Sequence, residues 1–268
     1  MKKTFTVFGD SIAKGIVLED DKIQICEQNT ISYIENHYNI KIQSSARYGL
    51  SLKKLMQRNV LLSYVQSLDH SKINYAIFSI GGNDADFDWE NVSKDPNSNH
   101  SMKTPLSTFT SLLNEAICLL QKHGVVVVLC TIMPINSTLY FENVISKIAD
   151  GKKVLQFLNN DLTNIHRVQE CYNTEIVKCA YRTNCILLDV RTPMQLTKDN
   201  AKYFCKDGIH PNSEGYKYLA DLYIEQINSN YQQFYTKNVY MQNKLLNYED
   251  TEKQNSWQFC SNCTKQLC

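Results

Sequence analysis

The sequence predicts an α/β protein in which a parallel sheet is covered by helices on both faces. Strand-like and helix-like segments alternate along the chain, which is typical of parallel strands connected by crossover helices. Two of the strand-like segments, residues 75–80 and 125–132, are apolar along nearly their whole length. Because a strand covered on both sides needs no polar face, these segments also favour a sheet between two helical layers.

Each element is predicted from the spacing of its apolar residues. Strands are expected at residues 3–9, 39–44, 75–80, 125–132 and 185–190. Helices are expected at residues 27–37, 51–68, 105–123, 154–182 and 213–227. Ser51 is a suitable N-cap for the second helix, and His123 followed by Gly124 is typical of a helix end. The polar residues 86–105 are expected to form a long loop, a kind of segment that is often functional.

The chain of 268 residues is long enough for one large domain with an appendage. We expect the domain at residues 1–227 and the appendage at residues 228–268, where Asn, Gln, Tyr and Lys become frequent. The tyrosines of the appendage are expected to pack against the domain. They are Tyr231, Tyr235, Tyr240 and Tyr248.

The cysteines allow two interpretations. The appendage ends in Cys260, Cys263 and Cys268, whose spacing suits zinc, but a second pair of ligands is missing nearby, which favours a tail without metal. We expect neither a metal nor a cofactor. Six other cysteines lie singly in predicted helices and strands, which favours reduced, buried thiols and a cytoplasmic location. They are Cys26, Cys118, Cys130, Cys171, Cys179 and Cys185.

The composition excludes several classes of partner. The formal net charge is +1, with acidic and basic residues interspersed, so no binding surface for nucleic acid or an anionic membrane is expected. The longest apolar run, residues 125–130, has the length of a strand and predicts no membrane span. Polar residues interrupt the apolar core that a signal peptide would need near the N-terminus. The expected partner is a small molecule, and the sequence does not indicate an oligomeric state.

A sharp turn is predicted where the first strand ends. The strand stops at Gly9, Ser11 follows two residues later, and helix-compatible residues resume behind it. Open α/β sheets bind their ligands at the carboxyl ends of strands, and a helix start offers free N–H groups there. Ser11 can therefore be a nucleophile, although a serine before a helix is more commonly an N-cap.

The loop before the last helix contains a base for such a nucleophile. His210 lies three residues after Asp207, a spacing that lets the carboxylate reach the imidazole and hold it in one tautomer. Pro211 biases the backbone of His210 towards an extended conformation. Given this pair, capping becomes the minor interpretation of Ser11, and a surface role for His210 becomes improbable.

Donors for an oxyanion are predicted in the turns that follow neighbouring strands. The candidates are the N–H groups of Ser11 and Gly49 and the side-chain amide of Asn83, although an asparagine can simply stabilise a tight turn. Asp10 and Asp84 are expected to serve as turn and capping residues rather than as acids in the reaction.

Four short blocks resemble, in order and approximate spacing, those of the SGNH (GDSL) hydrolase family. They are Phe8-Gly-Asp-Ser11, Gly49, Gly82-Asn-Asp84 and Asp207-Gly-Ile-His-Pro211. The resemblance spans roughly residues 3 to 227. It implies Ser11 as nucleophile, His210 as base, Asp207 as its orienting acid, and Gly49 and Asn83 as oxyanion donors. It also implies a flavodoxin-like three-layer α/β/α fold with strand order 2-1-3-4-5 and no metal. Residues 46–48 lack the asparagine that often precedes the family's glycine.

These features favour a serine esterase that forms an acyl-enzyme on Ser11, with a small-molecule ester as substrate. Short acyl groups on a sugar or a small alcohol are expected, because no extended apolar lid is present. Specificity is expected to reside in residues 85–105 and 134–145. Alternatives are an acyltransferase, or a thioesterase or lysophospholipase, with the same site, and a non-catalytic binding protein on the same fold.

Overall fold

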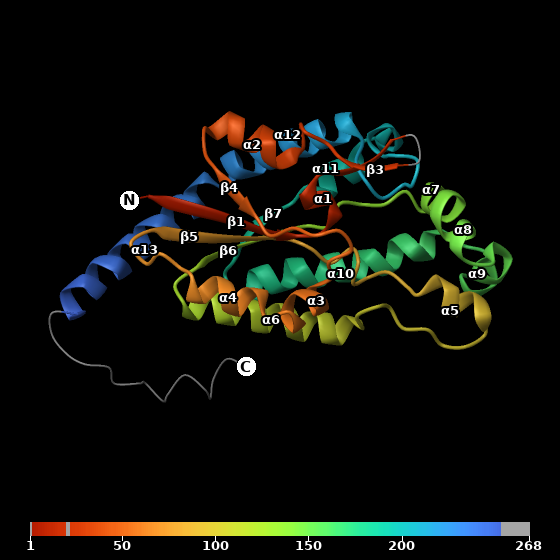
Figure 1. Cartoon of the computed structure of the whole chain (residues 1–268), viewed down its shortest axis with the longest axis horizontal. Helices are drawn as coiled ribbons and strands as arrows, with labels where there is room; N and C mark the ends of the chain where they lie inside the picture. Colours follow the sequence, from red (N-terminus) through yellow and green to blue (C-terminus); the bar gives the residue numbers. More distant parts are fainter. Residues whose placement is uncertain (1, 20–21, 253–268) are drawn as a thin grey trace.

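The computed structural model describes residues 2–19 and 22–252, and the side chains of these as far as residue 241. Its middle layer is a five-stranded sheet in which all neighbouring strands are parallel (Figure 1). In spatial order the strands are β4 (Ile42–Ser44), β1 (Lys3–Gly9), β5 (Ile73–Ser79), β6 (Val126–Cys130) and β7 (Ile186–Leu188). Numbered within this sheet alone, the order is 2-1-3-4-5, which confirms the predicted fold class.

Helices cover both faces of the sheet (Figure 1). One face carries α2 (Thr30–Tyr38), α12 (Ser213–Ser229) and α13 (Tyr231–Glu252). The other carries α3 (Leu52–Gln57), α4 (Val60–Gln66), α6 (Leu106–Lys122) and α10 (Thr163–Arg182). The larger apolar core lies on this second face, where Phe8, Phe78 and Leu129 of the strands pack against the helices. Burial of these side chains fixes the sheet between its two layers.

Shorter elements connect the layers at the carboxyl ends of the strands. They are α1 (Ser11–Lys14), α5 (Trp89–Lys94), α7 (Ser137–Tyr140), a π-helical turn (Phe141–Ile145), α8 (Ser146–Ile148), α9 (Gly151–Phe157), α11 (Arg191–Leu196) and a 3₁₀ turn (Asn200–Tyr203). Residues 86–105, expected as a loop, therefore contain a short helix, α5.

Two predicted long helices are each divided in the structure. The helix expected at 51–68 is split into α3 and α4, because Asn59 has a left-handed backbone with φ 54°. The helix expected at 154–182 is split into α9 and α10, where Asn159 and Asn160 have φ 53° and 57°. Asparagine tolerates this conformation better than most residues, so the breaks lie where the chain can adopt them most easily.

An antiparallel hairpin that the sequence analysis did not predict lies apart from the main sheet. It consists of β2 (Ile16–Glu19) and β3 (Lys22–Ile25). Val17 is buried against Cys205 and Tyr216, whereas Ile23 and Ile25 are exposed. The hairpin thus attaches to the domain through one strand only.

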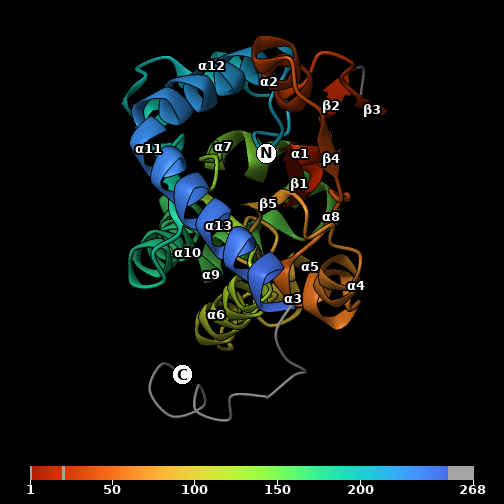
Figure 2. The same ribbon diagram turned by 90° about the vertical axis from the view of Figure 1, so that its left-hand side faces the viewer.

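Helix α13 lies across the end of the sheet at which β1 begins (Figure 2). Phe234 and Met241 pack against the cluster that contains Ile73 and Tyr75, and the Tyr75 hydroxyl contacts Asn238. Tyr231, Tyr235 and Tyr240 are more than half exposed and lie outside this cluster, although Tyr231 and Tyr235 line a cavity between α13 and the sheet. The expectation that they pack against the domain is wrong for Tyr240, and the side chain of Tyr248 lies outside the described residues.

The C-terminal cysteines Cys260, Cys263 and Cys268 lie outside the described residues. The cysteines that the structure describes are free thiols. Cys130, Cys179 and Cys205 are buried, but Cys118 and Cys171 are exposed, so the expectation of burial is wrong for those two. The domain boundary at residue 227 stays a prediction. Of the helices in the described residues, none is long and apolar enough to cross a membrane.

Candidate active site

A tight corner positions Ser11 at the carboxyl end of β1. A Cβ on Gly9 would lie 2.4 Å from the Cβ of Ala13, so the strand and α1 approach closely only because this residue is glycine. Asp10 caps the helix by accepting a hydrogen bond of 3.0 Å from the N–H of Ile12. Because Asp10 performs this capping, the side chain of Ser11 is free for another role. The prediction that Asp10 is a capping residue is confirmed.

Ser11, His210 and Asp207 form one hydrogen-bonded chain. Ser11 Oγ lies 2.8 Å from His210 Nε2, and His210 Nδ1 lies 2.6 Å from Asp207 Oδ2. All three side chains are buried. An ionised carboxylate can only accept hydrogen bonds, so Nδ1 carries the imidazole proton and Nε2 is left to accept the serine hydroxyl. The three residues predicted as a triad are therefore brought together with the polarity that a triad needs.

The carboxyl group of Asp207 is held in its ionised form. Burial alone would raise its pKa, but hydrogen bonds from His210 and from the backbone outweigh burial and lower the pKa below its ordinary value. Asp207 Oδ1 accepts from the N–H groups of Ile209 and His210 at 2.9 and 3.0 Å. Gly208, which follows Asp207, has φ +69°, and a Cβ there would lie 2.5 Å from the Asn136 carbonyl oxygen. The loop therefore requires glycine for its conformation as well as for space.

The hairpin contributes to this loop in a way that sequence reasoning missed. The backbone N–H of Cys205 donates to the His210 carbonyl at 2.8 Å, and its Sγ lies 3.3 Å from the Pro211 carbonyl. The N–H of Leu18, in β2, donates to the same Sγ at 3.3 Å. Cys205 thus connects the hairpin to His210 and Pro211, and so helps to hold the backbone of the predicted base in place. Its lone position in the sequence carries no signal of this role.

The turns that carry Gly49 and Asn83 are joined to each other. The Asn83 amide donates to the Leu50 carbonyl at 3.2 Å, which uses one of its two N–H bonds. Gly49 has φ +64°, a conformation suited to glycine. Asp84 is fully buried and accepts from the N–H of Leu52 at 2.8 Å, as expected of a capping residue.

Aromatic and charged side chains connect the two predicted specificity segments. Asp86 accepts from Trp89 Nε1 at 2.9 Å and from the Tyr140 hydroxyl at 3.0 Å, and it pairs with Lys103 at 2.6 Å. Tyr48, 55% exposed, stacks over the His210 ring with 6.1 Å between centroids. Residues 85–105 and 134–145 therefore form one connected unit, which the N–H of Asn136 joins to the triad loop by donating to the Gly208 carbonyl.

Burial of Asp10 has a measurable consequence for stability. Burial raises the pKa of Asp10 from 3.8 to about 6, so the folded state disfavours its charged form. The stability that Asp10 contributes is complete below its unfolded pKa and is lost as the pH rises through about 6. Asp10→Asn keeps an oxygen for the cap but cannot ionise. We expect it to be more stable than the wild type by up to about 3 kcal/mol at pH 8, and not at pH 4.

Thermal unfolding of both proteins between these pH values measures the difference. Asp199→Asn, at an exposed carboxylate, is the matched control and should show no such dependence. A stability difference that did not grow with pH would contradict the raised pKa of the buried Asp10.

No metal cluster accompanies this site in the part of the chain that the structure describes, where no group of three or more His, Cys, Asp or Glu side chains can hold an ion. A three-layer α/β/α fold with a serine, a histidine and an aspartate hydrogen-bonded at the carboxyl edge of its sheet is the arrangement of serine hydrolases. The family within this class follows from a match of the sequence to a family model. The chain belongs to the GDSL-like lipase/acylhydrolase family, whose family model matches residues 5–223.

Solved structures of lipases and esterases share the fold of this chain at low sequence identity. A lipase/acylhydrolase from Enterococcus faecalis is 16% identical, with 86% of this chain and 97% of that chain covered and a TM-score of 0.58. The acetyl xylan esterase AlAXEase is 20% identical, with 85% and 100% covered and a TM-score of 0.54. The esterase EstA from Pseudoalteromonas sp. is 14% identical, with 84% and 97% covered and a TM-score of 0.53. A search of curated proteins finds no significant match.

Proposed function

We propose that this acylhydrolase is a serine esterase that cleaves carboxylic esters through an acyl-enzyme on Ser11. The observation that carries the proposal is the distance of 2.8 Å between Ser11 Oγ and His210 Nε2, in a ring oriented by Asp207. A serine hydroxyl is a weak nucleophile on its own and needs such an adjacent base.

In the first half-reaction, His210 Nε2 takes the hydroxyl proton while Ser11 Oγ attacks the ester carbonyl carbon. Asp207 stabilises the imidazolium that forms. The tetrahedral oxyanion is received by the N–H groups of Ser11 and Gly49 and by the remaining N–H bond of Asn83. The imidazolium then gives its proton to the departing alcohol, and the acyl group stays on Ser11.

In the second half-reaction, water replaces the alcohol. His210 accepts a proton from the water as its oxygen attacks the acyl-enzyme, and then returns the proton to Ser11 Oγ as the carboxylic acid leaves. The ring must be neutral when it accepts each proton, because a protonated imidazole has no lone pair to offer.

We propose short acyl groups on a sugar or a small alcohol as the substrate class. The support for it is that residues 85–105 and 134–145, beside Ser11 and His210, are tied together by Asp86, Lys103 and the Tyr140 hydroxyl rather than forming an extended apolar lid. A long alkyl chain would find little apolar surface to cover it there, which favours short acyl groups.

Fluorophosphonate labelling combined with an ester series tests both parts of this proposal. Labelling should occur at Ser11, and kcat/KM for p-nitrophenyl esters should fall from acetate through butyrate to octanoate. Acetylated sugars should be hydrolysed as well. Absence of both labelling and hydrolysis would contradict a serine esterase, whereas a preference for octanoate would contradict only the substrate class. Product analysis with added alcohols distinguishes hydrolysis from acyl transfer.

A further inference from the structure

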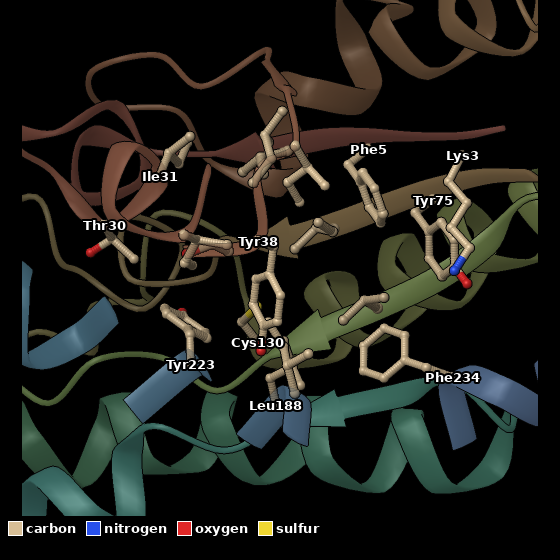
Figure 3. Close-up of a pocket in the computed structure, with 18 of the residues that line it drawn as sticks. Lys3, Phe5, Thr30, Ile31, Tyr38, Tyr75, Cys130, Leu188, Tyr223 and Phe234 are labelled. Atoms are coloured by element: carbon tan, nitrogen blue, oxygen red, sulfur yellow. The ribbon is translucent and has the colours of Figure 1, made fainter. Parts of the chain in front are cut away.

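A large apolar cavity lies behind the nucleophile, between the sheet and the helical layer of α2, α12 and α13 (Figure 3). It encloses about 730 Å³, which is within the range of small-molecule sites. Strand residues such as Val7 and Ile77 form one wall, and helix residues such as Ile34 and Ile227 form the other. Ile77 lies in the central strand and is nevertheless only half-buried, because the cavity reaches it.

The walls offer few hydrogen bonds to a ligand, because several of their polar groups are paired within the protein. The Thr30 hydroxyl donates to the Tyr216 carbonyl at 3.2 Å, and the Tyr38 hydroxyl donates to Asn228 at 3.0 Å. The Tyr75 hydroxyl contacts Asn238. A polar ligand would lose its hydration without compensation here, so the cavity selects an apolar one.

The cavity is elongated. It extends along β1 from Lys3 to Val7, a distance of about 13 Å for a strand, and continues to Ile12 and Ala13 of α1. Lys3 and Phe234 lie near one end, and Thr30 and Ile31 lie near the other (Figure 3). An elongated apolar space of this volume suits a single extended alkyl chain.

Positive charge lies at the end where the strands begin. Lys3 lines the cavity there and forms no ion pair among the described residues. Lys41 lines the same end, since its neighbour Ile42 pairs with Phe5, and it lies 3.8 Å from Glu35. A carboxylate at this end would find a cation while its chain occupied the apolar interior.

We propose that this cavity is a binding site for one long-chain fatty acid, distinct from the catalytic cleft. The carboxylate lies beside Lys3, and the end of the chain contacts Ile12 and Ala13 of α1. The site is independent of the proposed esterase activity, because Ser11 Oγ faces His210 rather than the cavity lining.

Direct binding to the full chain tests the proposal, with the fluorescent fatty acid cis-parinarate as probe and unlabelled acids as competitors. Affinity should increase from octanoate to laurate, by about fourfold for each methylene that enters the cavity. Saturating palmitate should also raise the melting temperature. Equal and weak binding of octanoate and palmitate would overturn the proposal.

Filling the cavity localises the site. Ile34→Trp and Ile77→Phe, from opposite walls, should each weaken palmitate binding at least tenfold. Leu62→Trp, at an exposed position on α4 behind the other face of the sheet, should not. Circular dichroism and melting temperature identify any variant that fails to fold. Folded Ile34→Trp and Ile77→Phe proteins that bound palmitate like the wild type would overturn the proposal, whether or not the protein is an esterase.

Reversing the charge of Lys3 tests where the carboxylate of the fatty acid lies. Lys3→Glu should weaken palmitate binding severalfold and leave hexadecanol binding unchanged, because the alcohol carries no charge. Lys2→Glu places the same charge one residue away, outside the cavity lining, and is the matched control. Equal effects of the two substitutions on palmitate would overturn the position of the carboxylate.

Discussion

Replacing Ser11 by alanine is expected to lower hydrolysis of p-nitrophenyl acetate by roughly 10⁴- to 10⁶-fold. The substitution removes the oxygen that lies 2.8 Å from His210 Nε2 and leaves the rest of the site in place. Because the N-cap of α1 is the side chain of Asp10, the short helix does not depend on the serine hydroxyl. Initial rates over a range of ester concentrations measure the loss, and fluorophosphonate labelling should disappear with it.

The fold of the Ser11→Ala protein can be verified by its melting temperature, which should lie within a few degrees of that of the wild type. Ser111→Ala removes a hydroxyl from an exposed position on α6 and should keep full activity and labelling. A folded Ser11→Ala protein that retained more than a few per cent of the wild-type rate would show that another group attacks the ester.

The identity of the candidate triad was predictable for a local reason, whereas the order of the strands was predicted only through the resemblance to the SGNH hydrolase family. Ser11 and the pair Asp207 and His210 lie in short turns whose residue types are demanded by close contacts, such as those of Gly9 and Gly208. In a parallel sheet the strands end at one edge, so residues in separate turns come together there. Capping by Asp10 then removed the alternative role of the serine.

The breaks in the helices were less predictable, because apolar spacing continues across them. Leu55 before Asn59 and Leu61 after it are both buried, so the pattern alone resembles one helix. The hairpin of β2 and β3 was missed because its apolar residues do not mark one buried face. Ile23 and Ile25, for example, are more than half exposed.

The cavity could not be predicted from sequence. Its lining residues, such as Ile34 and Ile77, are of the types that fill an ordinary apolar core. Whether such side chains touch one another or leave a space depends on the distance of α2 and α12 from the sheet. Helix α13 presents a related difficulty, since a mostly polar segment contacts the sheet through a few residues such as Phe234 and Met241.

Asp207→Asn is expected to lower kcat by about 10⁴-fold while the loop keeps its shape. An asparagine oxygen can still accept from the N–H groups of Ile209 and His210, as Asp207 Oδ1 does at 2.9 and 3.0 Å. Its NH₂ group, however, would face His210 Nδ1 as a donor. The imidazole would then carry its proton on Nε2, where it could no longer accept the proton of Ser11.

The tautomer effect should operate throughout the neutral pH range, because the carboxyl group that Asp207→Asn removes is ionised there. Hydrogen bonds from His210 and the backbone lower the pKa of Asp207, so the wild-type carboxylate is ionised throughout the neutral range, and the stability it contributes is lost only as the pH falls through that lowered value. Ionisation of Asp207 therefore adds no pH dependence of its own to the wild-type rate in the neutral range. Asp221→Asn, at an exposed position on α12, should have no effect on rate. A folded Asp207→Asn protein within tenfold of the wild-type kcat would mean that His210 is oriented by another group, and Asp207 would then be a structural residue of the loop.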